Sequence, residues 1–110
     1  MPLVINRQKK RMMMEIILNT SQTTYDLNDV RSALRAALRR ETVLAHSRRK
    51  AFEQTCREYE DQFSITTEQF LNDFEAGKLG DDLVYFDWYA AKRGFDLWDR
   101  RTKILDGVSM

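Results

Sequence analysis

The side chains in this sequence that could perform nucleophilic chemistry are few and lie far apart. The chain of 110 residues has one histidine, His46, and one cysteine, Cys56. Nucleophilic catalysis needs a nucleophile, a base and an orienting group in one place. These two residues are separated by nearly three helical turns, so their side chains cannot meet on one helix. They also cannot supply the usual zinc ligand set. We expect His46 to face solvent and Cys56 to be a small core residue.

The acidic clusters indicate helix capping rather than metal binding. Glu58-x-Glu60-Asp61 and Asp81-Asp82 could bind a hard cation, but neither has the alternating ligands and the glycine of an EF-hand loop. Adjacent carboxylates at Asp81-Asp82 suit the positive end of a helix dipole. The sequence also has no glycine-rich phosphate loop. We therefore expect a protein that is not an enzyme and needs no cofactor and no metal.

A basic stripe is the pattern best suited to nucleic acid. Arg31, Arg35 and Arg39 recur every fourth residue, which places them on one line of a helix, and Arg48-Arg49-Lys50 forms a second cluster. Such a stripe could follow a phosphate backbone. The alternative, which we favour, is that these side chains face solvent or pair with the acidic residues between 58 and 82, in the same chain or in a neighbouring one.

Local signals predict a short helix over residues 67–76. With Thr66 as N-cap, Gln69 completes the Thr-x-x-Gln form of a capping box, and Ile65 and Phe70 occupy the positions of a hydrophobic staple. Gly77 follows as the residue that ends a helix in the left-handed conformation. Three kinds of signal thus agree on the start of this helix, and one glycine marks its end.

A long helix is predicted before it, over residues 27–62. Asp26 is the expected N-cap, with Tyr25 and Val30 as staple residues, and no glycine or proline interrupts the stretch. About 36 residues at 1.5 Å each give roughly 54 Å, more than one small domain can cover.

The apolar stripe of this helix sets its expected contacts. Leu38, Ala45, Phe52 and Tyr59 recur every seventh residue, as in half of a coiled-coil seam, and Leu34, Cys56 and Phe63 extend the stripe, which Thr42 and Arg49 interrupt. We expect the half after Ala51 to pack against residues 70–98. The earlier half, with Leu34 and Leu38, has less of its own chain to cover it. This indicates self-association through residues 27–45.

The C-terminal helix is predicted over residues 82–105, capped by Asp81 or Asp82 and ended by Asp106-Gly107. It has two apolar stripes: Leu83, Phe86, Ala90, Leu97 and Ile104 form one, and Tyr85, Trp88, Phe95, Trp98 and Leu105 form the other. A helix that is apolar on more than one side is buried on more than one side. The stripes therefore predict either a wide core contact or a second contact with another chain.

Composition sets the fold class. One proline and four glycines are too few for a loop-rich β protein, and the predominance of helix formers predicts an all-α helical hairpin or bundle. Residues 25–110 are expected to form a single helical domain after a basic N-terminal arm, residues 1–24, that is either disordered or a short β-ribbon. No apolar run is long enough to span a membrane. No secretory signal is evident either, so we expect a cytoplasmic protein.

One stretch resembles a known group. It reads Tyr59-x-x-x-Phe63-Ser-Ile-Thr-Thr-Glu-Gln-Phe, then Phe74-Glu-Ala-Gly-Lys-Leu-Gly-Asp-Asp, then Tyr85-Phe86-Asp87-Trp88-Tyr89-Ala90. Residues 59–98 thereby resemble a group of short prokaryotic all-helical proteins, many of which are similar to antitoxins of toxin–antitoxin modules. The basic N-terminal arm departs from the pattern of that group.

The resemblance implies a protein that works by contact with a protein partner, such as a small toxin. It places Trp88, Tyr89 and Trp98 in packing, with any outward-facing member in the interface. The predicted partner-binding residues are Trp88, Tyr89, Trp98, Leu34 and Leu38. The expected function is an antitoxin-like, homo-oligomeric protein-interaction module. The alternatives are a basic helical protein that binds RNA or DNA and a self-assembling structural protein.

Overall fold

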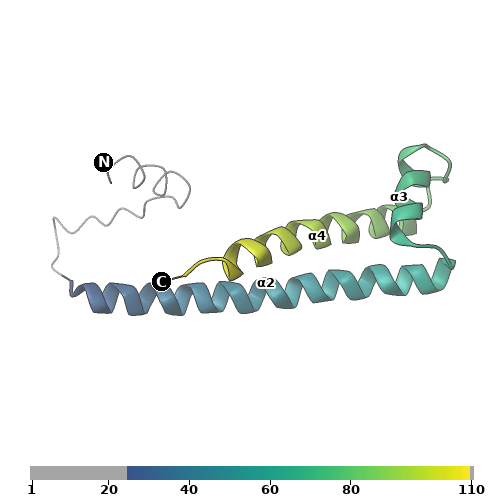
Figure 1. The fold of residues 1–110 in the computed structure, drawn as a ribbon. Helices are drawn as coiled ribbons and strands as arrows, with labels where there is room; N and C mark the ends of the chain where they lie inside the picture. The colour runs from purple at the N-terminus through teal and green to yellow at the C-terminus, as the bar shows by residue number, and fades with distance from the viewer. Residues whose placement is uncertain (1–24, 110) are drawn as a thin grey trace, which may run out of the picture. The chain divides into compact units, whose positions relative to one another are not determined.

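Three helices make up the part of the chain, residues 25–109, that the computed structural model describes. They are α2 (Leu27–Phe63), α3 (Thr67–Glu75) and α4 (Leu83–Asp106). Helices α2 and α4 form a hairpin, and α3 lies at the end where they are connected (Figure 1). The all-α prediction is confirmed, and each helix begins and ends within one residue of its predicted bounds.

The chain divides into two units, Met1–Val30 and Arg31–Met110. In the first unit the described residues hold the start of α2. The carboxylate of Asp26 accepts a hydrogen bond of 3.0 Å from the backbone N–H of Asn28, so the predicted N-cap is confirmed. Tyr25, predicted to be a staple residue, is largely exposed. The predicted basic arm, residues 1–24, lies outside the described residues.

Helices α2 and α4 are antiparallel in the second unit. Near the connected end, the rings of Phe63 and Tyr85 are 5.9 Å apart. At the other end, His46 Nε2 lies 2.9 Å from Asp106 Oδ1. Helix α2 has 37 residues and α4 has 24, a difference of roughly 20 Å at 1.5 Å per residue. The turns of α2 that carry Leu34 therefore lie beyond the length paired with α4.

The start of α3 is fixed by two acceptors. Thr66 Oγ1 accepts a hydrogen bond of 3.1 Å from the backbone N–H of Gln69, which confirms the predicted N-cap. The returning bond of the capping box, from the Thr66 N–H to the Gln69 side chain, is not formed, because the Gln69 side chain donates forward to Asp73 at 3.0 Å. The next N–H group, that of Thr67, donates to Glu60 Oε2 of α2 at 2.8 Å. A long-range contact thus satisfies one of the N–H groups that the first turn of a helix leaves unpaired.

The end of α3 is a complete Schellman motif. Gly77 has a φ of 72°, as predicted for a residue in the left-handed region. The N–H of Lys78 donates to the carbonyl of Asp73 at 2.9 Å, and the N–H of Gly77 donates to the carbonyl of Phe74 at 3.1 Å. This geometry turns the chain into the short connector before Asp82, which caps α4.

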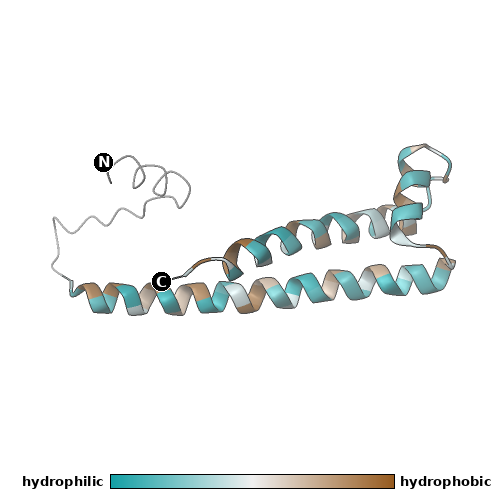
Figure 2. Cartoon of the chain, viewed as in Figure 1, coloured by the Kyte–Doolittle hydropathy of each residue, from teal (hydrophilic) through white to brown (hydrophobic). Residues whose placement is uncertain are grey.

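The core is aromatic and lies at the connected end. Phe70 and Trp88 are fully buried and stack with their centroids 4.0 Å apart and their planes at 5°. Tyr59 and Phe63 of α2 each lie 5.5 Å from the Trp88 ring. The hydropathy colouring shows apolar residues on the helices of this end (Figure 2). The predicted packing of the second half of α2 against residues 70–98 is confirmed.

Candidate functional site

The two residues weighed for catalysis lie where the sequence places them. Cys56 is buried in the core cluster, and the side chain of His46 is half exposed beside Asp106. Within residues 25–109, no group of three or more His, Cys, Asp or Glu side chains is arranged to hold a metal ion. No described helix has the length and apolar character needed to cross a membrane.

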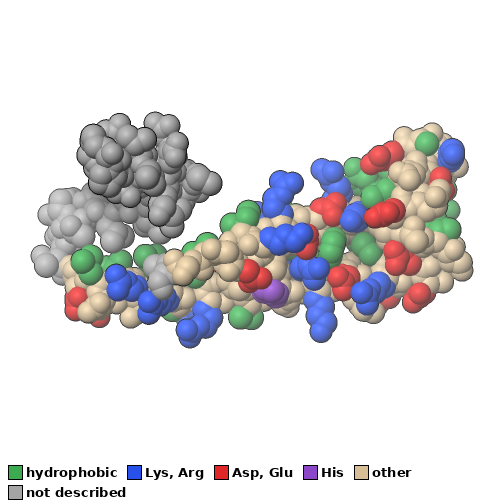
Figure 3. Space-filling model, viewed as in Figure 1, with side chains coloured by type: hydrophobic (Ala, Val, Ile, Leu, Met, Phe, Trp, Pro, Cys, Tyr) green, Lys and Arg blue, Asp and Glu red, His purple; other side chains and the backbone are tan. Residues whose placement is uncertain are grey.

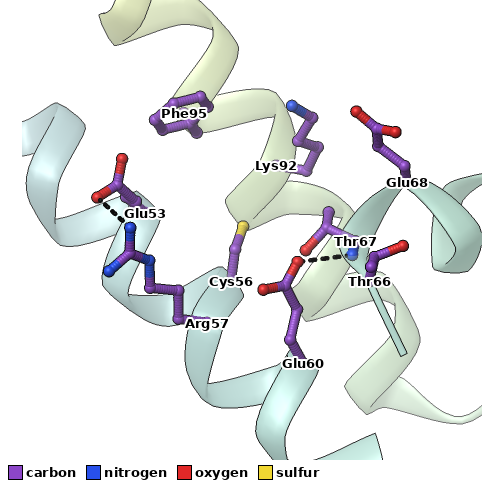
Figure 4. A pocket seen from close by; sticks show the side chains of 9 residues that line it. All are labelled: Glu53, Cys56, Arg57, Glu60, Thr66, Thr67, Glu68, Lys92 and Phe95. Carbon is purple, nitrogen blue, oxygen red and sulfur yellow. Dashed lines mark hydrogen bonds and ion pairs between the residues drawn. The ribbon is translucent and has the colours of Figure 1, made fainter. Parts of the chain in front are cut away.

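A pocket opens beside Cys56, between α2, the start of α3 and α4 (Figure 4). Most of its charged groups have partners inside the chain: Arg57 lies 3.4 Å from Glu53, Glu60 accepts the Thr67 N–H, and Lys92 pairs with Asp96. Burial raises the pKa of the Cys56 thiol, which opposes formation of the nucleophilic thiolate. The arrangement therefore suits a packing contact between the three helices better than a reactive site.

Arg49 forms a polar clasp with α4. Its Nε donates to Asp99 Oδ1 at 2.8 Å, and Lys103 Nζ lies 2.9 Å from the other oxygen of Asp99. The guanidinium also lies 5.1 Å from the ring of Phe95. These two hydrogen bonds, the one from Arg49 first, hold the pKa of Asp99 below its usual range. At Arg49, the interruption of the apolar seam is thus a charged contact between α2 and α4.

The basic residues considered for nucleic acid fall into two groups. Arg48 lies 4.8 Å from the ring of Trp98, and Arg49 is held by Asp99, so both contact α4. The acidic groups near Arg49 are Glu53 and Asp99, neither of which lies in the segment 58–82 that was expected to supply them. The remaining members are exposed on α2: Arg31, Arg35, Arg39 and Lys50. Basic side chains gather along the paired length of α2 and α4 (Figure 3).

The two apolar stripes of α4 differ in burial. Trp88 and Trp98 of one stripe are buried against the rest of the chain. The other, named here the α4 outer stripe, consists of Leu83, Phe86, Ala90, Leu97 and Ile104, and all five are exposed. Its large members expose 77%, 49%, 46% and 60% of their surface, in chain order. The expectation of burial on both sides is therefore wrong within one chain, because a single helix, α2, covers α4 along most of its length.

A second exposed apolar surface lies on α2. Named here the α2 outer patch, it lines a shallow hollow and consists of Arg39, Arg40, Val43, Leu44 and Ser47. Val43 is 65% exposed and Leu44 is 38% exposed. Ala45, between these positions and the α4 side, is fully buried. The inner side of α2 is therefore buried as far as Ala45, which is further towards its N-terminus than the sequence indicated. The α2 outer patch stays uncovered within the described part of the chain.

The five predicted partner-binding residues take different places. Trp88 and Trp98 are buried, which confirms their packing role and leaves little of either side chain at the surface. Tyr89 is partly buried, with its ring stacked 5.0 Å from that of Phe74. Leu34 and Leu38 are partly buried. A role in partner binding stays a prediction for Tyr89 and the two leucines.

Val43 and Leu44 were missed because they fall outside the seven-residue seam that drew attention to α2. The signal that could have found them is an adjacent pair of large apolar residues outside the seam. Thr67 was also missed. Its hydroxyl accepts the Trp88 indole N–H at 3.1 Å, a role visible only once α3 and α4 are placed together.

In comparisons with known proteins, no family model matches the chain, and no curated protein or solved structure matches it. The resemblance to antitoxins stays a prediction.

Proposed function

We propose that this chain is a helical protein-interaction module that acts by contact with a protein partner. The observation that carries the proposal is the pair of exposed apolar surfaces on helices whose other side is already packed. A core with stacked, fully buried aromatic rings does not need those side chains for its own packing. Contiguous apolar surface left outside such a core is typical of a binding site.

The α2 outer patch is the surface that supports a heterologous partner. Val43 and Leu44 supply apolar contact area, and Arg39 and Arg40 line the same hollow. Arginine beside apolar anchors is a composition favoured at interfaces. The matching partner has an apolar side chain flanked by carboxylates. An antitoxin-like role fits this chemistry, with a small protein toxin as the partner.

Co-expression tests this function. The product of the neighbouring reading frame, produced together with the tagged full chain, is expected to co-purify with it and to lose its toxicity. Val43→Asp places a carboxylate in the α2 outer patch and is expected to abolish both effects. Ala51→Asp makes the same kind of change at an exposed α2 position outside the patch and is the matched control. Retention of the complex by the Val43→Asp variant would overturn the assignment of the surface.

A second candidate, nucleic-acid binding, has its own observation. Arg31, Arg35 and Arg39 are exposed on one line of α2. Titration of the chain with random duplex at low and moderate salt separates the candidates. A salt-dependent association that falls when the three arginines are changed to glutamine supports this function, and no association at low salt rejects it.

A further inference from the structure

The α4 outer stripe has the spacing of a helix that pairs with another helix. Leu83, Ala90, Leu97 and Ile104 recur every seventh residue, and all are exposed. A seven-residue repeat keeps one line of side chains facing a partner helix over its whole length. The opposite line of α4, which includes Trp88, already faces the core. The stripe therefore has the geometry of a second helix contact that the chain itself does not fill among residues 25–109.

Phe86, the largest member of the stripe, is held in position. Its ring meets that of Phe74 edge-on, with centroids 5.5 Å apart at 88°. Phe74 in turn stacks on Tyr89 at 5.0 Å. An exposed aromatic side chain that is already ordered loses less conformational freedom when it becomes buried. Phe86 is thus a pre-positioned anchor at the N-terminal end of the stripe.

The charges beside the stripe are segregated along α4. Asp82 and Asp87 lie at its N-terminal end, whereas Arg100 and Arg101 lie towards its C-terminal end. Two acidic residues of the C-terminal half, Asp99 and Asp106, are paired with Arg49 and His46 of α2, and Asp99 also holds Lys103. The charges left beside the stripe are therefore acidic near one end and basic near the other, which makes them complementary to an antiparallel copy. This distribution identifies the occupant of the stripe, because charge next to the apolar line governs partner choice and orientation.

We propose that the α4 outer stripe binds the same stripe of a second copy of this chain, antiparallel and about a two-fold axis. One register pairs the four residues of the seven-residue repeat: Leu83 packs on the partner's Ile104, and Ala90 packs on the partner's Leu97. In the same register Asp87 lies opposite the partner's Arg100 and next to the partner's Arg101. The two-fold axis repeats each contact, as an isologous interface requires. The result is a four-helix dimer with the two α4 helices at its centre.

A parallel pairing of the same stripe is unfavourable. It would place Arg93 beside the partner's Arg93 and Arg100 beside the partner's Arg100, and it would bring together the acidic ends that contain Asp87. Like charges across an interface oppose association. The antiparallel register leaves one like-charge contact, between the two Arg93 side chains near the two-fold axis. It also places Asp96 of each copy close enough to these arginines to offset their repulsion. Antiparallel pairing is therefore the arrangement that the charges favour.

Sedimentation velocity on the full chain at tens of micromolar tests the dimer. The unsubstituted chain is expected to show a reversible monomer–dimer equilibrium. Leu97→Gln combined with Ile104→Gln removes two exposed apolar contacts per copy and is expected to weaken the dimer by more than about tenfold without unfolding the monomer. Val43→Gln, a change at a similarly exposed apolar residue of the α2 outer patch, is the matched control and should leave the dimer intact. A monomeric unsubstituted chain, or a dimer indifferent to the Leu97 and Ile104 changes, would overturn the proposal.

A charge exchange tests the orientation. Asp87→Arg alone and Arg100→Asp alone are each expected to weaken the dimer, because each places like charges opposite one another in the antiparallel register. The double variant restores opposite charges and is expected to recover most of the affinity. Circular dichroism of each variant at low concentration reports whether the hairpin itself is folded. Tighter association of the Asp87→Arg variant alone, or no recovery in the double variant, would reject the antiparallel register.

The dimer and the proposed function fail separately. Val43→Asp should abolish binding of the heterologous partner and preserve the dimer. The Leu97 and Ile104 changes should do the reverse. A chain that dimerises but binds no neighbouring product would leave the inference standing and remove the proposed function.

Discussion

The indole Nε1 of Trp88 donates a hydrogen bond of 3.1 Å to Thr67 Oγ1, and both side chains are buried. This bond joins α4 to the first residue of α3. Thr67 is held from the other side by Glu60 of α2, which accepts its backbone N–H. One threonine thus links all three described helices at the centre of the aromatic core.

Thr67→Val is expected to destabilise the hairpin by about 1–3 kcal/mol, because the shape is kept and the buried Trp88 N–H loses its acceptor. Urea unfolding followed by tryptophan fluorescence measures the change. The control is Thr55→Val. The hydroxyl of Thr55 bonds only within its own helix, where it donates to the Ala51 carbonyl at 3.1 Å. We expect a change within about 0.5 kcal/mol there. Equal losses for the two variants would remove the special role of the Trp88 bond.

Gly94 is expected to resist substitution in spite of its place inside a helix. A Cβ at this position would lie 2.6 Å from the Phe52 ring, too close for any carbon contact. Gly94→Ala gains up to about 1 kcal/mol of helix propensity and loses about 1–3 kcal/mol to overpacking, so we expect net destabilisation in urea unfolding. Adding Phe52→Leu should make the alanine less harmful, and additive effects of the two changes would contradict the contact.

The features that the sequence could predict are those set by residues close together in the chain, such as the ends of the helices. Thr66 and Gly77 begin and end α3 through bonds that span a few residues, and their roles follow from residue type and spacing. The bond from Arg49 to Asp99 and the bond from the Thr67 N–H to Glu60 depend on how the helices are placed against one another. No local pattern encodes that placement. Arg49 therefore looked like a defect in the seam until its partner on α4 was known.

The same limit explains the α4 outer stripe. The sequence shows two apolar lines on α4, and it does not show how many helices are available to cover them. With one long helix opposite, the line containing Trp88 is buried, and the line containing Leu97 is exposed. The apolar pattern thus identified both lines of residues and left open whether the second meets the core or another chain; within residues 25–109 that line is exposed.

Thr102→Val is expected to stabilise the protein. Thr102 is buried on the inner side of α4, and its hydroxyl has no hydrogen-bond partner within the described part of the chain. Burial of an unsatisfied hydroxyl costs about 1–3 kcal/mol, so the isosteric apolar residue should recover part of that cost. Thr102→Ser keeps the hydroxyl and removes a methyl group, and it should destabilise. Thermal unfolding of the three proteins gives the order Val, Thr, Ser, and a less stable valine variant would contradict it.

Asp99 is expected to make the clasp sensitive to acid. Hydrogen bonds from Arg49 and Lys103 hold its pKa below the ordinary value, which is about 3.9 in an unfolded chain. A depressed pKa in the folded state means that the unfolded state binds the proton more readily between the two values. The stabilisation is therefore complete above the unfolded pKa and is lost as pH falls through the folded pKa.

Asp99→Asn tests that window, because it removes the titrating group and keeps an acceptor. Its urea midpoint should lie below that of the unsubstituted chain at neutral pH, and the difference should shrink as pH falls below about 4. Asp96→Asn is the control. It breaks an exposed pair with Lys92 on α4 alone, and pairs of that kind contribute little. Parallel pH profiles for the unsubstituted chain and Asp99→Asn would show that the clasp with Arg49 does not contribute to stability through the carboxylate charge.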